Sequence, residues 1–267
     1  MHGRCWLLLW RRDHVTGKSD GPRGKQTATG VSGATPCQGN GEIADGCGPA
    51  IIIMAKAPVA GFVKTRLTDG FTPDEIAELA ACFLADTVSR AKQTGRTVFI
   101  AYSPASGRNI IESIAGEDVR WLCQPGGDLG ARMAAAFAGA AAEGFGPLVM
   151  VGTDSPNLPP ASYETAFCAL RSGDTDLVLG RTDDGGYYLI GMRSLCAALL
   201  EGIAWSGPTV FDQTVANAAR LGMRVREILP WYDVDTPEDL DRLRQDLLGD
   251  PAGSERAPTT REWLKSH

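Results

Sequence analysis

Apolar and polar positions alternate with two different periods over residues 49–249. The first apolar run, residues 50–55, is continuous and rich in isoleucine, which is typical of a strand buried on both faces. Residues 73–93 instead carry apolar side chains every three or four positions, and Thr72, Pro73 and Glu75 form a helix-capping signature at their start. By the same criteria we expect strands over residues 97–102, 119–123, 148–151, 176–180, 187–192 and 223–229, and helices over residues 109–115, 129–143, 161–171, 210–221 and 237–248.

Strands that alternate with helices in this way predict an α/β fold, a mainly parallel sheet with helices on both faces. Neither a repeat nor a linker interrupts residues 49–249, so we expect a single domain there. Residues 1–48 are rich in Gly, Ser, Thr, Lys and Arg and follow neither period, which predicts a disordered N-terminal extension whose deletion leaves stability and ligand binding intact. Residues 250–267 are expected to form a polar C-terminal tail.

Composition narrows the class of protein. The chain has 267 residues, 22% of them charged, and a net charge of −6, so we expect no nucleic-acid partner, while small anionic ligands stay possible. No apolar segment approaches the length of a membrane span, and we expect no membrane partner. The seven cysteines include no C-x-x-C pair, which argues against a zinc site and for a reducing compartment. These features predict a soluble, cytoplasmic protein and leave its oligomeric state open.

Histidine is absent from the predicted domain, because the three histidines are at positions 2, 14 and 267. A Ser-His-Asp triad, a Cys-His pair and an H-E-x-x-H zinc site are therefore excluded from its core. Chemistry must come from carboxylates, lysines, arginines, hydroxyls, backbone amides or a bound metal.

The apolar run that begins at Pro147 ends abruptly in Gly152-Thr153-Asp154-Ser155-Pro156. A buried strand there puts the Asp154 carboxylate at its carboxyl end, where ligands bind in open α/β sheets. Mg²⁺ prefers carboxylate oxygens and usually arrives with substrate phosphates, so Asp154 is a candidate metal ligand and catalytic residue. The alternative is an Asx-turn ahead of Pro156.

The loop after the first predicted strand carries three cations, Lys56, Lys64 and Arg66, together with Gly61. Backbone amides and cations of this kind suit a polyphosphate ligand. The loop is neither a Walker A loop nor a dinucleotide-binding fingerprint, because glycines of both patterns are missing. A solvated basic loop is the alternative for any one cation, and the presence of three favours nucleotide binding.

Two further stretches are ambiguous by themselves. Gly127 and Arg132 lie at the predicted start of a helix, where backbone amides can face an anion, but Asp128 could equally be a simple N-cap. Asp184 belongs to Asp-Asp-Gly-Gly ahead of a predicted strand, a pattern that also makes an ordinary tight turn.

The segment before the last predicted helix separates into two parts. Thr236 and Asp239 are explained by helix capping. Asp233 and Asp235 are not, and their i, i+2 spacing in an extended segment puts both on one side.

Taken together, these motifs resemble an uncharacterised bacterial family of the nucleotide-diphospho-sugar transferase (GT-A) superfamily, whose members are often described as arsenosugar biosynthesis glycosyltransferases. More distantly, the first loop resembles that of 2-phospholactate guanylyltransferase. The motifs that carry the resemblance are Lys56-Ala57-Pro58, Gly61-x-x-Lys64-Thr65-Arg66-Leu67, Gln124-Pro125-x-Gly127-Asp128-Leu129-Gly130-x-Arg132-Met133, Gly152-Thr153-Asp154-Ser155-Pro156, Asp184-Gly185-Gly186-Tyr187-Tyr188-Leu189-Ile190-Gly191 and Asp233-Val234-Asp235-Thr236-Pro237-Glu238-Asp239-Leu240.

The resemblance implies a GT-A-like Rossmann-type fold and a transferase whose partners are a nucleotide, above all a nucleotide-diphospho-sugar, and a small-molecule acceptor. It implies that Asp154 and Asp235 hold Mg²⁺ or Mn²⁺ and that Lys64 and Arg66 help to neutralise a leaving diphosphate. It also puts Asp184 beside the second substrate, as a base or a ligand of hydroxyls.

One departure keeps other activities open. Many GT-A glycosyltransferases carry a local Asp-x-Asp at the central strand, where this chain has Thr153-Asp154-Ser155. The alternatives to glycosyl transfer are a nucleotidyltransferase that releases pyrophosphate and a GT-A domain that only binds nucleotide.

Overall fold

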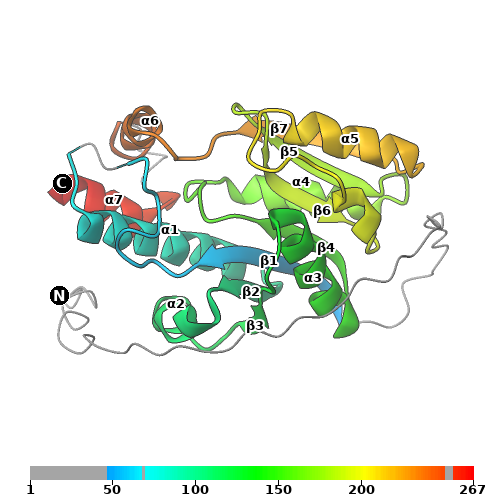
Figure 1. Cartoon of the computed structure of the whole chain (residues 1–267), viewed down its shortest axis with the longest axis horizontal. Coiled ribbons are helices and arrows are strands. Elements are labelled where there is room, and N and C mark those ends of the chain that lie inside the picture. Colours follow the sequence, from blue (N-terminus) through cyan, green and yellow to red (C-terminus); the bar gives the residue numbers. More distant parts are fainter. Residues whose placement is uncertain (1–46, 68–69, 250–254) are drawn as a thin grey trace, which may run out of the picture. The chain divides into compact units, whose positions relative to one another are not determined.

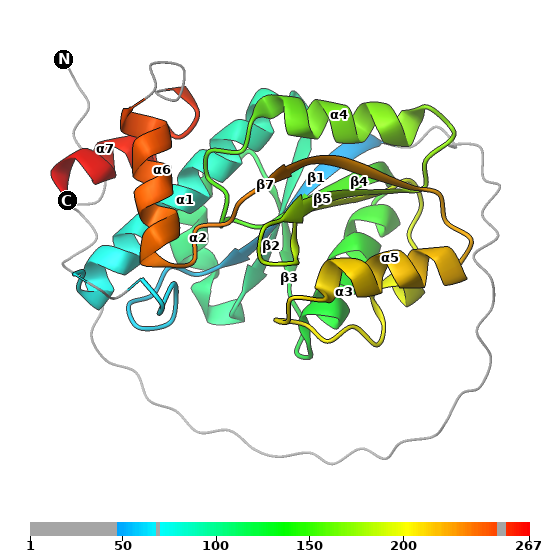
Figure 2. The same cartoon turned by 90° about the horizontal axis from the view of Figure 1, so that it is seen from above.

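The structure, a computed structural model, describes residues 47–67, 70–249 and 255–267, and the structural statements below concern these residues. They form a sheet with helices on both of its faces (Figures 1 and 2). This arrangement is the α/β fold that the sequence predicts.

The described sheet has seven strands in the order β3-β2-β1-β4-β6-β5-β7. Neighbouring strands are parallel except for β6, which runs antiparallel to both β4 and β5. The strands are β1 (Gly48–Lys56), β2 (Thr97–Ser103), β3 (Arg120–Cys123), β4 (Phe145–Val151), β5 (Leu177–Thr182), β6 (Tyr187–Met192) and β7 (Val225–Trp231). The α-helices are α1 (Pro73–Gln93), α2 (Arg108–Ala115), α3 (Leu129–Ala142), α4 (Pro160–Arg171), α5 (Val210–Arg220), α6 (Pro237–Leu248) and α7 (Pro258–Ser266), and the 3-10 helices are η2 (Ala105–Gly107) and η3 (Ala197–Leu200).

Strand β1 is buried on both faces, as its continuous apolar run predicts. Ile51 and Ile53 pack on one side with residues of α1, α2 and α4. Ile52 packs on the other side with residues of α3 and α5. Because successive side chains of a strand point to opposite faces, one unbroken apolar run serves two cores.

Two helices begin with the capping boxes that the sequence predicts. In α1 the Thr72 side chain accepts the Glu75 backbone N–H, and the Glu75 side chain accepts the Thr72 N–H. In α6 the Thr236 and Asp239 side chains do the same. Each box satisfies backbone N–H groups that have no partner within their own helix.

The polar tail predicted for residues 250–267 is wrong for its last part, where the structure has helix α7. Trp263 and Leu264 of α7 are buried in an apolar cluster with residues of α1 and α6, and Figure 2 shows the three helices at one end of the fold. The Asp86 carboxylate of α1 accepts the N–H groups of Thr259 (3.0 Å) and Thr260 (2.7 Å), which caps α7. The buried apolar side chains and this distant cap hold the short helix in place.

The predicted disordered extension, residues 1–48, lies almost entirely outside the described residues and stays a prediction, except that Gly48 already belongs to β1. None of the helices that the structure describes combines the length and apolar character needed to cross a membrane. The cytoplasmic location also stays a prediction.

The topology brings four connecting segments to one edge of the sheet. The carboxyl ends of the parallel strands lie at this edge, and the antiparallel strand β6 starts from it. The segments are residues 57–67 and 70–72 after β1, residues 152–159 after β4, residues 183–186 between β5 and β6, and residues 232–236 after β7. Ligands of open α/β sheets bind at such an edge.

Candidate active site

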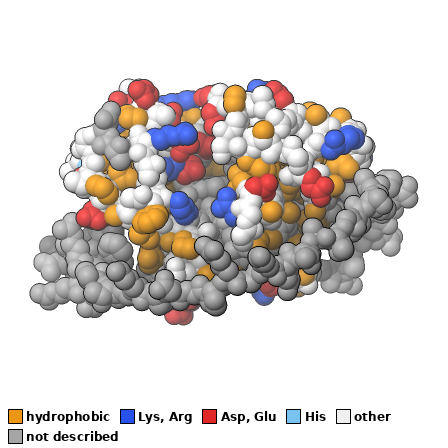
Figure 3. Space-filling view, viewed as in Figure 1, with side chains coloured by type: hydrophobic (Ala, Val, Ile, Leu, Met, Phe, Trp, Pro, Cys, Tyr) orange, Lys and Arg blue, Asp and Glu red, His pale blue; other side chains and the backbone are white. Residues whose placement is uncertain are grey.

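A cavity of about 870 Å³ opens at this edge and is lined by all four segments. Seven predicted site residues line it, namely Lys56, Lys64, Arg66, Arg132, Asp154, Asp184 and Asp235. Figure 3 shows acidic and basic side chains close together near the middle of one face of the molecule. The fold therefore assembles one charged cavity from motifs that are far apart in the sequence.

Lys64 lies at the centre of the charged groups. Its Nζ contacts Asp154 Oδ1 and lies 2.7 Å from Asp235 Oδ1 and 2.8 Å from the Val234 carbonyl oxygen. The Lys64 side chain is only 8% exposed, whereas each of the two carboxylates is 42% exposed. Burial by itself would lower the pKa of Lys64, but the two carboxylates outweigh it and raise the pKa above its ordinary value.

Lys64 also has an unusual backbone conformation, with φ of 46°. A residue with a side chain rarely adopts this left-handed region, and such residues concentrate at functional sites. The conformation belongs to the loop after β1, so this loop directs its lysine toward the segments after β4 and β7.

The two carboxylate-bearing segments are joined by their own contacts. The Val234 N–H donates to the Asp154 carbonyl oxygen at 2.8 Å. Ser155 Oγ lies 2.6 Å from Asp233 Oδ1 and 2.9 Å from the Tyr232 carbonyl oxygen. Burial, together with nearby Asp154, raises the pKa of Asp233 to about 7. Asp233 thus stands beside the cluster as a third acidic side chain.

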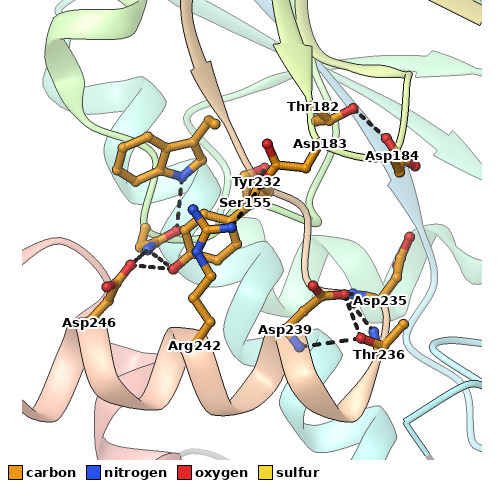
Figure 4. A network of polar contacts seen from close by, with 12 residues as sticks. Ser155, Thr182, Asp183, Asp184, Tyr232, Asp235, Thr236, Asp239, Arg242 and Asp246 are labelled. Carbon is orange, nitrogen blue, oxygen red and sulfur yellow. Dashed lines mark hydrogen bonds and ion pairs between the residues drawn. The ribbon is translucent and has the colours of Figure 1, made fainter.

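A polar network behind the cavity fixes the segment after β7 (Figure 4). The Tyr232 hydroxyl donates to Asp246 of α6 and accepts from Asn157 Nδ2 at 2.7 Å. Trp231 Nε1 donates to Asn157 Oδ1 at 3.2 Å. The fully buried Asn157 lies in the loop after β4, so the network ties that loop, the end of β7 and α6 together. The segment after β4, which carries Asp154, and the segment after β7, which carries Asp235, are thereby fixed to each other and to α6.

The turn between β5 and β6 forms another wall of the cavity. Asp184 Oδ1 accepts from Thr182 Oγ1 at 2.6 Å and from the Gly186 N–H at 3.0 Å, so this oxygen makes an Asx-turn, the structural alternative. Gly185 has φ of 88°, and a Cβ atom there would lie 2.0 Å from the Pro208 carbonyl oxygen. Only glycine therefore lets the 205–208 segment approach the turn closely.

The remaining predicted residues divide into two groups. Lys56 donates to the Phe62 carbonyl oxygen at 2.5 Å, and Arg132 donates to the Asp128 carbonyl oxygen at 3.3 Å. Both side chains still line the cavity, as does Arg66. Gly61 and Gly127 do not, and each has a positive φ that suits a turn. Asp128 is the N-cap of α3, accepting from Ala131 N–H at 2.8 Å.

Asp233, Gln124 and Trp205 are among the cavity residues to which sequence reasoning gave no individual role. Asp233 was visible in the sequence through its i, i+2 relation to Asp235. Gln124 and Trp205 also line the cavity. Gln124 begins one of the motifs that carry the family resemblance but suggests no role of its own, and Trp205 belongs to none of these motifs. Trp205 packs so closely on Gly130 of α3 that a Cβ atom there would lie 2.8 Å from the indole nitrogen.

The metal predicted between Asp154 and Asp235 can be tested against these contacts. The pair fits Mg²⁺ or Mn²⁺ by donor type, because such ions are held by one or two carboxylates plus substrate oxygens. The two carboxylates also converge on one cation, which in this structure is the Lys64 ammonium group. Within the described part of the chain no group of three or more His, Cys, Asp or Glu side chains is arranged to hold a metal.

Comparisons with known proteins agree with the motifs. Residues 86–207 match DUF2064, a family of uncharacterised proteins conserved in bacteria. No curated protein matches the chain. The crystal structure of a candidate nucleotide-diphospho-sugar transferase from Desulfovibrio desulfuricans G20 is 31% identical, with a TM-score of 0.75, over 82% of this chain and 94% of its own.

A second solved structure supports the fold alone. It is a 4-diphosphocytidyl-2C-methyl-D-erythritol synthase, 13% identical, with a TM-score of 0.51 over 78% of this chain and 100% of its own. The Desulfovibrio protein shows more than a shared fold, because its 31% identity over 82% of this chain indicates membership of the same family. The chain belongs to the bacterial GT-A-like family of nucleotide-diphospho-sugar transferase-like proteins, as its motifs predict.

Proposed function

We propose that this protein transfers a glycosyl group from a nucleotide-diphospho-sugar to a small-molecule acceptor, with Mg²⁺ or Mn²⁺ as cofactor. The observation that carries the proposal is that the cluster of Lys64, Asp154 and Asp235 shares one cavity with the Asp184 turn. The charged cluster would form the donor subsite of this cavity, and the Asp184 turn would form its acceptor subsite. The 31% identical Desulfovibrio protein supports the same class of donor.

The donor end is suited to a diphosphate. Lys56 at the end of β1, Lys64 and Arg66 in the loop after it, and Arg132 of α3 all line the cavity, so four cations face the same space. A leaving nucleoside diphosphate carries more charge on its terminal oxygen than the intact nucleotide-sugar does. Fixed cations therefore stabilise the transition state more than the bound substrate, which is how they would accelerate the transfer.

The cofactor would be held by Asp154 and Asp235. When bound there, a divalent cation supplies charge neutralisation and orientation for the diphosphate oxygens. The segments after β4 and β7 keep the two carboxylates close together, because the Val234 N–H donates to the Asp154 carbonyl oxygen at 2.8 Å.

The acceptor end is the turn between β5 and β6. Asp184 lines the cavity and commits only its Oδ1 to the turn, with Oδ2 left to bind an acceptor hydroxyl. In the transfer, the bond between the anomeric carbon and the diphosphate oxygen breaks, and the diphosphate keeps its electron pair. The acceptor oxygen bonds to the anomeric carbon and its proton passes to Asp184.

Nucleotidyl transfer is the second candidate, and the sequence Thr153-Asp154-Ser155 favours it because the local Asp-x-Asp is missing. In that reaction a phosphorylated acceptor attacks the α-phosphorus of a nucleoside triphosphate and pyrophosphate leaves. The same cations and carboxylates would serve it, and the product alone separates the two reactions. A domain that only binds nucleotide would form neither product.

Radiolabelled substrates test the proposal. The protein is incubated with a panel of nucleotide-sugars and, separately, with nucleoside triphosphates, each with mixed small-molecule acceptors. Release of nucleoside diphosphate supports glycosyl transfer, whereas release of pyrophosphate would replace it with nucleotidyl transfer. Asp184→Asn should lose the transfer, and Asp183→Asn is the matched control, because Asp183 pairs with Arg242 at 2.9 Å and does not line the cavity.

A further inference from the structure

We propose that Lys64 is a built-in competitor of the divalent cation: its ammonium group occupies the position between Asp154 and Asp235 until a nucleotide diphosphate draws it away. The inference rests on the proposed function, since it assumes that these carboxylates hold the metal. It goes further by making nucleotide and metal binding depend on each other through one side chain.

The contacts of Lys64 support this role. A single Nζ atom contacts one oxygen of Asp154, one oxygen of Asp235 at 2.7 Å and the Val234 carbonyl oxygen at 2.8 Å. Three acceptors match the three donors of an ammonium group, so the group is fully satisfied. A divalent cation that uses the same two carboxylate oxygens must take the place of this ammonium group.

Burial makes the competition effective. The Lys64 side chain is 8% exposed, so it is held within the protein, whereas the carboxylates are 42% exposed toward solvent. A tethered cation stays at high local concentration beside its partners, and attraction between opposite charges is weakened less by water and salt at a buried site than at an exposed one. Metal alone should therefore bind weakly to the free protein.

The charges explain why nucleotide changes the outcome. Two carboxylates and one ammonium group leave a net charge of −1 at the cluster, counting only these three groups. A divalent cation would neutralise the two carboxylates, but it would deprive the displaced ammonium group of both carboxylate partners. A nucleotide diphosphate supplies negative oxygens for that group in the same cavity, so metal and nucleotide should bind cooperatively.

The loop conformation is consistent with a movable lysine. Lys64 has φ of 46°, a conformation that is costly for a residue with a side chain and that is maintained here by its contacts. Its neighbour Arg66 lines the same cavity but makes no ion pair with a carboxylate of the described residues. Arg66 is therefore a matched control of the same charge on the same loop.

The test measures binding of Mn²⁺ alone, without nucleotide, by electron paramagnetic resonance of free Mn²⁺ and by calorimetry. The proteins are the full-length chain, Lys64→Met, Lys64→Gln and the control Arg66→Met. Removing the competing charge should tighten Mn²⁺ binding about tenfold or more in both Lys64 variants, while Arg66→Met should change it by less than about twofold. Equal or weaker Mn²⁺ binding by the Lys64 variants would overturn the proposal.

A Lys64 variant that fails to fold without metal still tests the proposal. If a Lys64 variant is unfolded without metal, because its two carboxylates then repel each other, millimolar Mn²⁺ should restore its folded circular dichroism spectrum. No restoration would contradict the proposal. Turnover of nucleotide-sugars is measured separately on the wild-type protein. Tighter Mn²⁺ binding by the Lys64 variants, with no turnover by wild type, would overturn the proposed function and leave the competition standing. Turnover by wild type, with unchanged Mn²⁺ binding by the variants, would overturn the competition and leave the proposed function standing.

Discussion

Two neighbouring substitutions, Asp235→Asn and Thr236→Ala, should separate chemistry from stability within one short segment. Thr236 Oγ1 accepts the Asp239 N–H at 3.3 Å and is the N-cap of α6. Asp235 faces the cavity and contacts Lys64 Nζ at 2.7 Å. Thr236→Ala should therefore destabilise the protein and leave turnover per folded molecule unchanged, whereas Asp235→Asn should abolish turnover.

The expected losses of stability are similar in size, so stability cannot explain a difference in activity. Removing an N-cap hydroxyl costs about 0.5–2 kcal/mol. Replacing the Asp235 carboxylate removes one of the two ion pairs of a buried ammonium group, which costs about 1–3 kcal/mol because Asp154 still contacts Lys64. In a domain of this size each kcal/mol lowers the melting temperature by roughly 2–4 °C.

The lysine also decides the sign of the stability change expected for Asp235→Asn. Two carboxylates held together without a cation would repel each other, and Asp235→Asn would then stabilise the metal-free protein. With Lys64 between them, the same substitution should destabilise it.

The assay combines thermal unfolding with product release, normalised to the folded fraction. Turnover of Asp235→Asn should fall about 100-fold or more, the order seen when a group that stabilises transition-state charge is removed. An Asp235→Asn protein that keeps its activity per folded molecule while losing stability would show that Asp235 is a structural residue, and the account of the cluster would be wrong.

Three further predictions concern other parts of the fold. Hydrogen bonds from Arg224 lower the pKa of Asp176 to about 2, so this stabilisation is fully present above the ordinary value of 3.8 and is lost as pH falls through about 2. Asp176→Asn should cost about 1 kcal/mol at pH 7 in urea unfolding, and a difference from wild type that is as large at pH 2 as at pH 7 would contradict it. Asp86→Ala should cost about 1–3 kcal/mol in the same assay by removing the cap of α7, and unchanged stability would mean that α7 does not need this cap. Gly185→Ala should impair acceptor use more than donor binding, because its Cβ would lie 2.0 Å from the Pro208 carbonyl oxygen; wild-type kinetics with both substrates would refute this.

Much of the fold could be predicted from the sequence because local signals and tertiary packing agree. The isoleucines of residues 50–55 form β1, and the capping residues Thr72 and Thr236 start α1 and α6. In each of these elements the spacing of apolar residues matches the side that is buried, and in α1 and α6 the capping residues mark the same start. The direction of β6 has no such local signal, because a strand buried in a mixed sheet has the same pattern in either direction.

Helix α7 shows why a local pattern can be insufficient. Its nine residues are short for a helix that must form from its own sequence, and what holds it lies far away in the chain. Asp86 supplies its cap, and α1 and α6 cover Trp263. These partners could be identified only after the chain had folded.

The candidate site divides in the same way. The carboxylates at positions 154, 184 and 235 and the cations of the first loop could be found from motifs, and they line one cavity. The contact between Lys64 and the pair Asp154–Asp235 could not, because it joins residues up to 171 positions apart through side-chain geometry. Gly61 and Gly127 were expected near the nucleotide, and the structure uses their positive φ in turns outside the cavity lining.

Calorimetry of nucleoside diphosphate binding tests the central claim, that this cavity binds the diphosphate of a nucleotide through Asp154 and a divalent cation. ADP, CDP, GDP and UDP are titrated into wild type and Asp154→Asn, each in excess Mg²⁺ and in excess chelator. We expect at least one nucleotide to bind wild type about tenfold or more tightly with Mg²⁺, and Asp154→Asn to bind it weakly in both conditions. Wild-type affinity that is equal in Mg²⁺ and in chelator for every nucleotide, or the absence of binding to any of them, would contradict the account.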